Sequence, residues 1–500
     1  MSNEASAISL KADRLVAGGH FQSALPLYQE ALKRDPHRPD DWFNLAVCLR
    51  RTGEDEQALN AYQEALNYGV SGPEEVLLNR AVILSDQLNR PAEALQDLRA
   101  ALAIRPDYVA ALLNLGNLHE ELGEAREATA CYERLLELSQ LDPNHRARAL
   151  ARLTHLKPPK AVGDPAFDSL SKAASQAGLD PVIAASLHLA SARALDRLGQ
   201  VDPAFKAMSR GKALLARVGP AYRPKQVEAR VDELIRAFPD VESIPAPAPS
   251  DRPRPVFILG LYRSGSSLVE QMLSAHPDVL TGGELDILPR LFGNPFSSDQ
   301  RRELAPDAAV LDQFGSRYWQ LLGQRFDDLD QAKVVTDKRL DNHFLVGFLA
   351  KMFPEARFIH THRHPLDNAL SIFMQHLDSG WVPYANRFQD ISHFSIQTRR
   401  LINHWRTVLP DRIQECNYDQ LVHDPETNLK DILQFLDLPW DPRCLNFHMH
   451  AGQVQTASYW QVRNPLYQKA SGRWRRYAHH LQSLKRSLQP LLEATDSSLS

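Results

Sequence analysis

Small and apolar residues return at a fixed spacing along the first third of the chain, separated by polar and charged positions. The segment Gly19–Pro36 recurs as Gly53–Leu66, again around Ala94, and once more between Leu115 and Tyr132. Each copy is shifted by about 34 residues from the one before it. Alanine and glycine allow two antiparallel helices to pack closely, while a tyrosine or leucine fills the space beside the next copy. The pattern therefore predicts a stack of helical hairpins.

The four copies resemble tetratricopeptide repeats, whose period is also about 34 residues. The resemblance covers residues 5–143 and implies a helical solenoid with a concave face that binds an extended peptide or a protein partner. A weaker helical hairpin follows around Leu198-Gly199 and Ala204, within a helical extension that we place at residues 144–243. This hairpin is predicted to be a degenerate repeat that caps the solenoid.

The pattern changes after a proline-rich stretch at residues 244–255. This stretch is predicted to be an extended linker, because proline cannot occupy a helix interior. Beyond it, short buried strands alternate with helical stretches as far as residue 495. The alternation predicts a parallel sheet wrapped by helices, with ligands bound beyond the carboxyl ends of the strands. The four expected strands are Val256–Leu261, Lys333–Thr336, Arg357–Thr361 and Arg412–Asn417.

The first of these strands leads into a turn and then a helix that is expected to begin at about Ser266. Backbone N–H groups at a helix N-terminus form an anion cradle, and the helix dipole adds to the attraction. The turn lacks the lysine of a Walker A motif. It resembles instead the 5′-phosphosulfate loop of sulfotransferases, in the arginine-bearing form of tyrosylprotein sulfotransferases and of bacterial repeat-linked sulfotransferases, which implies an α/β P-loop-like domain at residues 256–495. The residues that carry the resemblance are Arg263, Ser264, Gly265, Ser266, Ser267 and Leu268.

Two further segments extend this resemblance. Arg363 follows a strand and Ser371 lies eight residues later on a helix, as in the family's site for the 3′-phosphate of PAPS (3′-phosphoadenosine 5′-phosphosulfate). An arginine fork and a hydroxyl are both suited to phosphate. Lys338, at the end of another strand, matches a family lysine that meets the oxygen bridging sulfur and phosphorus. An ammonium group there stabilises the charge that develops as the sulfonate leaves.

A carboxylate is expected to accept the proton of the acceptor hydroxyl. The segment Val279–Asp286 resembles the family segment that holds this base, but it has one glutamate after the glycines where two are usual. The alignment is therefore ambiguous by one residue. We prefer Glu284 as the base, with Asp286 as the second choice. The simpler interpretation of either acid is a residue that caps or begins a helix.

Near the C-terminus, Gly472 and Arg473 resemble part of a segment that closes over the nucleotide in bacterial relatives. The resemblance implies that Gly472 allows close approach of the backbone and that Arg473 reaches the 3′-phosphate. Tyr418 occupies the place of a tyrosine that lies near the adenine in related enzymes, and a half-buried tyrosine at a strand end is the simpler alternative. Trp474 is predicted to belong to the core.

The composition of the chain further narrows the classes of protein to which it can belong. Hydrophobic residues make up 43% and charged residues 24% of the chain, as in ordinary globular proteins, and the net charge of −4 argues against a nucleic-acid partner. The four cysteines lack the spacing of a disulfide framework, and His360, His362 and His364 have no carboxylate or cysteine at zinc-site spacing. No long apolar run or signal peptide is evident. These features predict a cytoplasmic protein that binds neither a metal nor a membrane.

Together the resemblances imply a PAPS-dependent sulfotransferase that moves a sulfonate group to an acceptor hydroxyl. The acceptor is a protein tyrosine, a sugar or a small phenol. Two other classes stay open at this point. A phosphoryl-transfer enzyme needs a loop lysine, which is missing, and an aspartate that binds Mg²⁺. A repeat adaptor with a decayed, weakly active domain is expected to lack Arg263, Lys338 or Arg363, and all three are present.

Overall fold

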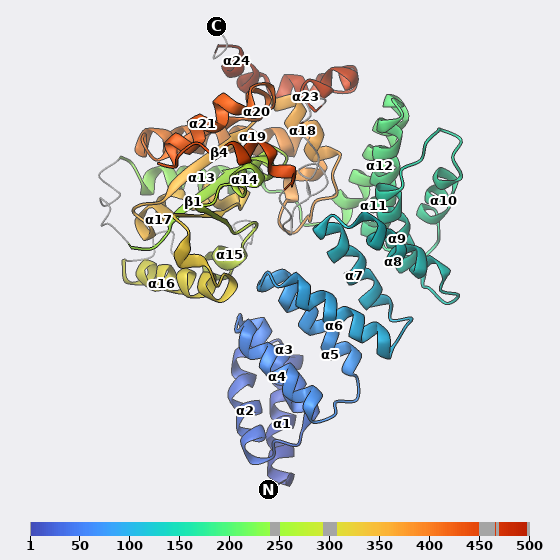
Figure 1. Cartoon of the computed structure of the whole chain (residues 1–500). Coiled ribbons are helices and arrows are strands. Elements are labelled where there is room, and N and C mark those ends of the chain that lie inside the picture. Colours follow the sequence, from blue (N-terminus) through green and yellow to red (C-terminus); the bar gives the residue numbers. More distant parts are fainter. Residues whose placement is uncertain (1, 241–250, 294–307, 450–465, 467–469, 498–500) are drawn as a thin grey trace. The chain divides into compact units, whose positions relative to one another are not determined.

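The computed structural model of the chain (Figure 1) describes residues 2–240, 251–293, 308–449, 466 and 470–497. It divides into two compact units. The first comprises Met1–Leu141 and Gly323–Phe326, and the second comprises Asp142–Leu322 and Asp327–Ser500. The expected fold class is confirmed, because helical repeats precede a domain built on a five-stranded parallel sheet. Within the described ranges, none of the helices is both long and apolar enough to cross a bilayer.

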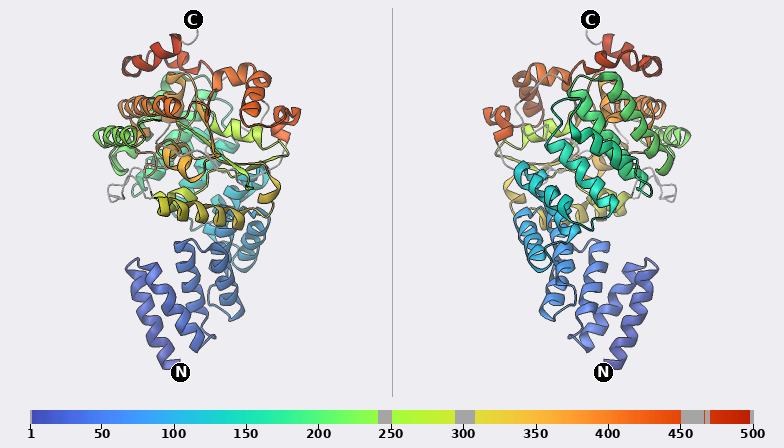
Figure 2. Two further views of the ribbon diagram at one scale, coloured as in Figure 1. Left: turned by 90° about the vertical axis from the view of Figure 1, so that its left-hand side faces the viewer. Right: turned by 90° about the vertical axis from the view of Figure 1, so that its right-hand side faces the viewer.

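The repeats of the first unit form antiparallel helix pairs that lie side by side (Figures 1 and 2). Gly116 on α7 packs against Tyr132 on α8, where a Cβ atom would come within 2.7 Å of the tyrosine Cε1. Tyr28 and Tyr62 occupy equivalent, fully buried positions in earlier repeats. The small-residue and tyrosine pattern therefore has the packing role that the sequence predicts. The helices are α1 (Ser2–Ala17), α2 (Phe21–Arg34), α3 (Pro39–Thr52), α4 (Asp55–Asn67), α5 (Pro73–Val82), α6 (Pro91–Ile104), α7 (Val109–Leu122) and α8 (Ala125–Glu137).

The second unit begins with five helices that form the helical extension. The first three start at an Asp-Pro pair, in which the carboxylates of Asp142, Asp164 and Asp180 accept hydrogen bonds from backbone N–H groups of the first turn. The predicted hairpin is formed by the two long helices that meet at Leu198. The helices are α9 (Pro143–Leu156), α10 (Pro165–Ala174), α11 (Pro181–Arg197), α12 (Val201–Val218) and α13 (Pro224–Ala237).

The sheet of the second unit has the strand order β2-β3-β1-β4-β5, and all its neighbouring strands are parallel. Four strands match the predicted ones to within about two residues at each end. The sequence pattern did not predict β2, which has three residues and pairs only with β3 at the edge of the sheet. The predicted linker falls partly outside the described residues, and Arg254 already belongs to β1. The strands are β1 (Arg254–Gly260), β2 (Val279–Thr281), β3 (Val334–Asp337), β4 (Arg357–His362) and β5 (Ile413–Asn417).

Both faces of the sheet are covered by helices, as parallel sheets require. Val256 and Ile258 of β1 face a core shared with α14 and α21. Phe257, between them, points to the opposite face and stacks on Phe358, with ring centroids 5.6 Å apart. The covering elements are α14 (Ser266–Leu273), α15 (Ile287–Phe292), α16 (Ala308–Arg325), α17 (Val346–Met352), α18 (Pro365–Phe373), α19 (Phe388–Val408), α20 (Tyr418–His423) and α21 (Pro425–Phe435). Short 3-10 helices η4 (Leu340–Phe344), η5 (Pro383–Asn386) and η7 (Arg473–Tyr477) lie between them and after them.

Candidate active site

The predicted phosphate-binding loop joins β1 to α14. Arg263 and Gly265 have φ angles of 68° and 106°, so the chain turns sharply just before the helix begins at Ser266. A side chain at position 265 would collide with Tyr418, since a Cβ atom there would lie 2.6 Å from the tyrosine Cδ2. Glycine is therefore needed both for its conformation and for space. The turn leaves the N-terminal N–H groups of α14 to serve as an anion cradle.

The three serines of the loop are buried. Ser264 Oγ lies 2.7 Å from Oγ1 of Thr361, and this hydrogen bond ties the loop to β4. The side chain of Leu268 packs in the core, and its N–H donates to the carbonyl oxygen of Gly265. Leu268 therefore helps to fix the shape of the loop.

The loop contacts the segment that is predicted to bind the 3′-phosphate. Nε of Arg263 donates a 3.2 Å hydrogen bond to Oγ of Ser371 on α18. The two residues are 108 positions apart in the chain, yet parallel pairing of β1 with β4 brings the ends of both strands together. Two motifs that were identified separately in the sequence thus meet at the carboxyl ends of the central strands.

Arg363 follows β4 directly, and its side chain is 6% exposed. Nη2 donates to the carbonyl oxygen of Ala470 at 2.7 Å, and the guanidinium lies 4.6 Å from the centre of the Tyr418 ring. Nε is buried and has no hydrogen-bond partner among the described residues. A buried cationic N–H without an acceptor is costly, so an anion at this position would satisfy it. Tyr418 contacts both Gly265 and Arg363, between the two predicted phosphate sites.

The C-terminal segment is fastened to the same edge of the sheet. The buried carboxylate of Asp367 accepts hydrogen bonds from the backbone N–H groups of Gly472 at 2.6 Å and Trp474 at 2.8 Å. Gly472 has a φ of 73°, a conformation that favours glycine. Trp474 is half-buried and stacks on His364. The earlier part of the predicted closing segment, apart from Leu466, lies outside the described residues.

Arg473 is the first residue of η7, and its side chain contacts the helical extension. Its guanidinium forms an ion pair with Asp196 of α11, whose carboxylate also accepts a 2.6 Å hydrogen bond from the Tyr477 hydroxyl. Arg476 lies 3.6 Å from the same carboxylate. Asp196 is 6% exposed and was not identified from the sequence, because its three partners lie about 280 residues further along the chain.

Lys338 and Glu284 lie side by side at the ends of the neighbouring strands β3 and β2. Lys338 is fully buried, and its Nζ donates a 2.5 Å hydrogen bond to Oε1 of Glu284, which is 31% exposed. The backbone N–H of Lys338 also donates to the carbonyl oxygen of Gly283 at 2.9 Å, which fixes the glutamate loop against β3. Gly283 has a φ of 70°, so one of the two glycines before Glu284 is explained by backbone conformation.

Asp286 lies in a different environment. Its Oδ2 accepts a 2.8 Å hydrogen bond from Nε of Arg290, one turn later on α15, and the carboxylate is 44% exposed. This is the helix-start role that the simpler interpretation of the sequence expected. Of the two candidate bases, Glu284 alone contacts Lys338.

Two buried acids near Lys338 and Glu284 were not predicted from the sequence. Oε1 of Glu270, on α14, accepts hydrogen bonds from the N–H of Gly283 at 3.0 Å and from Oγ1 of Thr336 at 2.9 Å. Burial raises the pKa of Glu270, and the nearby Lys338 partly offsets this effect. Burial also raises the pKa of Asp337 to about 7. The available signal for Glu270 was an acid that directly follows Leu268 and Val269 on the helix after the loop.

The histidines on β4 show no metal-site arrangement among the described residues. The rings of His360 and His362 stack at 5.6 Å, and burial lowers their pKa values to about 3 and about 4. Both rings are therefore neutral at neutral pH. The described residues include one cluster with metal-ligand geometry, Asp202, His479 and His480, and it contains none of the predicted site residues.

Comparison with known proteins assigns both parts of the chain. Residues 255–442 match the model of the sulfotransferase family, and residues 9–74 and 87–153 match models of the tetratricopeptide repeat. An uncharacterised protein of Aquifex aeolicus strain VF5 is 26% identical over 430 residues, which cover 83% of this chain and 55% of that protein. Protein-tyrosine sulfotransferase 1 of Danio rerio is 27% identical over 225 residues, which cover 41% of this chain and 59% of the relative. The chain thus spans between half and two thirds of the length of each.

Among solved structures, the sulfotransferase domain of the olefin synthase of Synechococcus PCC 7002 is 23% identical. The match covers 46% of this chain and 90% of that domain, with a TM-score of 0.36. The family models and the parallel sheet carry the assignment. Residues 255–442 therefore form a domain that matches the sulfotransferase family, and tetratricopeptide repeats precede this domain.

Proposed function

We propose that the chain transfers a sulfonate group from PAPS to the hydroxyl of an acceptor. One observation carries this proposal: each of the three central strands, β3, β1 and β4, is followed at its carboxyl end by a buried or half-buried cation. These cations are Lys338, Arg263 and Arg363. Three cations at one edge of a parallel sheet suit a ligand that has more than one anionic group.

The roles follow from the contacts. Arg263 and the first-turn N–H groups of α14 would hold the 5′-phosphosulfate, while Arg363 and Ser371 would hold the 3′-phosphate. The unpartnered Nε of Arg363 is a donor that this phosphate would satisfy. PAPS supplies a sulfonate on a good leaving group, so the protein's task is to orient it and to stabilise charge.

Glu284 is proposed as the base and Lys338 as the group that stabilises the leaving oxygen. In this structure the two side chains form an ion pair with each other. An acceptor hydroxyl that enters beside Glu284 would donate its proton to the carboxylate as the oxygen–sulfur bond forms. Lys338, held in place by its backbone bond to Gly283, would then face the oxygen that leaves sulfur.

A protein or peptide tyrosine is the acceptor that we propose. The repeats of the first unit are a module suited to bind an extended peptide, and several relatives are named protein-tyrosine sulfotransferases. We further propose that the reaction takes place in the cytoplasm, where the four buried cysteines stay as thiols.

The test is sulfonate transfer by the full chain. The protein is incubated with ³⁵S-labelled PAPS and, in separate reactions, a tyrosine-containing acidic peptide, a simple phenol and a set of sugars. Labelled peptide that requires an intact tyrosine is the expected product. Labelled phenol or sugar without labelled peptide would support the proposed sulfonate transfer but would overturn the proposal that the acceptor is a protein tyrosine. No transfer to any acceptor, with a folded protein that binds PAP, would favour the adaptor class.

A further inference from the structure

A pocket lies in the second unit, between the helical extension and the sulfotransferase domain. It has a volume of about 410 Å³ and is lined by α12 on one side and by α18, η5 and the start of α19 on the other. None of the predicted site residues lines it, although Phe373 follows Ser371 by only two positions on α18. The residues that matter here are Phe205, Lys212, Arg217, Phe373, Arg387 and Phe388.

Lys212 is a buried cation with little to neutralise it. Its side chain is 1% exposed, and the nearest polar contact is a 3.4 Å hydrogen bond from Nζ to Oδ1 of Asn386. Nζ lies 5.9 Å from the centre of the Phe373 ring. No ion pair within the described part of the chain includes Lys212, and no acidic residue lines the pocket. Burial accordingly lowers the pKa of the amine to about 7. Natural proteins rarely bury an ammonium group without a carboxylate.

Two more cations lie at the pocket, on opposite sides. Arg217 belongs to α12 and Arg387 immediately precedes α19, and both side chains are exposed. Neither forms an ion pair among the described residues. Asp390, one turn into α19, interacts with Arg387 at longer range and does not line the pocket. Three positive groups with no lining carboxylate make the pocket complementary to an anion.

The walls between these cations are aromatic. The ring of Phe205 stacks on those of Phe373 and Phe388 at 6.3 Å each, and the latter two stack at 4.2 Å. Such walls suit a flat apolar body.

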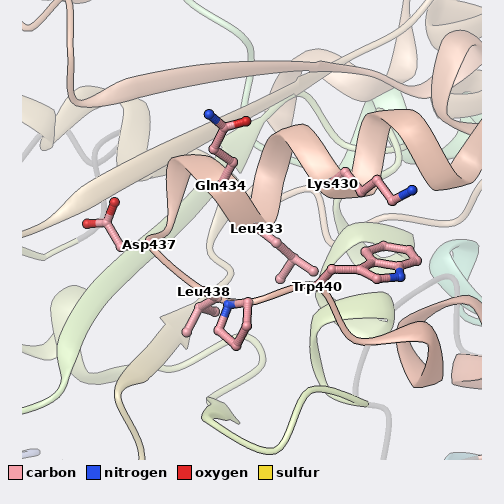
Figure 3. Close-up of a pocket in the computed structure, with 7 residues that line it drawn as sticks. Lys430, Leu433, Gln434, Asp437, Leu438 and Trp440 are labelled. Atoms are coloured by element: carbon pink, nitrogen blue, oxygen red, sulfur yellow. The ribbon is translucent and has the colours of Figure 1, made fainter.

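A pocket elsewhere on the same unit offers a useful contrast. It has a volume of about 440 Å³ and also contains a lysine, as Figure 3 shows. That lysine, Lys430, is half-exposed, donates a 2.6 Å hydrogen bond to Glu426, and lies 5.0 Å from the centre of the Trp440 ring. Asp437 lines the same pocket. The positive charge of Lys430 is therefore already paired with a carboxylate, whereas Lys212 forms no ion pair among the described residues.

We infer that the pocket between α12 and α18 is a binding site for a small aromatic carboxylate, whose carboxylate pairs with Lys212 while its ring lies among the three phenylalanines. Arg217 and Arg387 attract the anion from solvent and contact its outer edge. The inference does not depend on the proposed reaction, because it uses neither the sheet edge nor the nucleotide.

The first test is calorimetry of the full chain with 2-naphthoate, and with the uncharged 2-naphthylmethanol for comparison. We expect 2-naphthoate to bind with one site per chain, and the alcohol to bind at least tenfold more weakly. Lys212→Met and Arg387→Gln should each weaken 2-naphthoate by about tenfold or more. Lys206→Met, an exposed lysine on the same helix, is the matched control and should leave binding unchanged. Equal binding by folded Lys212→Met would overturn the inference, as would displacement of 2-naphthoate by PAP.

The second test needs no variant. Binding of the anion should favour the charged amine, so near pH 7.5 the complex should take up a proton from the buffer. Calorimetry in buffers of different ionisation enthalpy measures this uptake. His376 is the titratable neighbour of Lys212, and burial lowers the pKa of that ring to about 4, so it stays neutral in this range. Binding without proton uptake would place the anion away from Lys212 and overturn the assignment.

Discussion

Nζ of Lys338 donates a 2.5 Å hydrogen bond to Oε1 of Glu284, from the end of β3 to the loop after β2. The lysine is fully buried, while the glutamate is about one third exposed. The geometry therefore leaves one side of the carboxylate open to an entering hydroxyl. It also places the ammonium in the interior, where it interacts electrostatically with Glu270 of α14.

Glu284→Gln should lower kcat by about 10²–10⁴-fold, because glutamine keeps the shape of the side chain but cannot accept the acceptor's proton. Calorimetric affinity for PAP should change little. Asp286→Asn is the matched control, since that carboxylate pairs with Arg290 on the surface and should be dispensable. Normal turnover in Glu284→Gln together with collapse in Asp286→Asn would transfer the role of base to Asp286.

Lys338→Met should lower kcat by about 10²–10³-fold with a smaller effect on PAP affinity, because the charge that it meets develops only in the transition state. Lys333→Met, at the other end of β3, removes a lysine that is 67% exposed and should be neutral. Steady-state kinetics and PAP calorimetry on the two variants separate the effects. Equal losses of PAP affinity and of kcat/KM would make Lys338 a binding residue only.

Arg363→Ala should abolish discrimination between PAP and AMP. The substitution removes a charge-assisted contact between the guanidinium and the 3′-phosphate, which is worth about 1.5–3 kcal/mol. Arg357 lies on the same strand but pairs with the exposed Asp437, so Arg357→Ala serves as the control. Thermal shifts with PAP and with AMP measure the preference. A variant that still favours PAP by the wild-type margin would exclude Arg363 from the 3′-phosphate site.

The strand ends and the repeats could be predicted because their signals are local. A buried apolar strand followed by small polar residues is visible within about twelve residues, and so are Arg263, Lys338 and Arg363. Parallel pairing then brings these residues to one edge without further information. The edge strand β2 was missed because three residues are too few to show an alternation.

Other site features depend on contacts that a local pattern does not contain. Asp196 meets Arg473 across 277 residues, and neither segment carries a sign of the other. The burial of Glu270 and Asp337 follows from the packing of α14 and α16 against the sheet, so an isolated acid in the sequence gave no hint of its altered pKa. Lys212 is similar, because a lysine on an amphipathic helix is usually solvated.

Asp337 should make the protein less stable as pH rises from about 4 to 7. Burial raises the pKa of its carboxyl from 3.8 to about 7, so over this range the folded state holds a proton that the unfolded state has released. Asp337→Asn removes the titrating group. Relative to wild type, the free energy of unfolding of this variant should therefore be higher at pH 8 than at pH 5, by on the order of 1–3 kcal/mol.

Urea unfolding at both pH values gives the difference in unfolding free energy between wild type and Asp337→Asn. The opposing contribution of the buried histidines is the same in both proteins and drops out of this difference. Asp330→Asn, at an exposed position, is the control and should show no such change. A difference between variant and wild type that is the same at pH 5 and pH 8 would contradict a raised pKa for Asp337.

Asp196→Ala should loosen the segment that carries Gly472. Asp196 is the shared acceptor of Arg473, Arg476 and Tyr477, and the substitution removes the carboxylate that all three contact, at a cost of about 1–3 kcal/mol. The segment also reaches the sheet edge through Asp367, which binds the N–H groups of Gly472 and Trp474. We therefore expect the KM for PAPS to rise several-fold, with a smaller change in kcat.

Limited trypsin digestion reports on the same change directly, because Arg473, Arg475 and Arg476 are cleavage sites within the segment. Cleavage there should be faster in Asp196→Ala and should return toward the wild-type rate when PAP is bound. Asp202→Ala is the matched control: its carboxylate is 74% exposed and accepts hydrogen bonds from His479 and His480, just beyond the segment. If both variants are cleaved at the wild-type rate, Asp196 does not hold the segment. If both are cleaved faster to the same extent, the loosening reflects general weakening of the contact between the helical extension and the C-terminus.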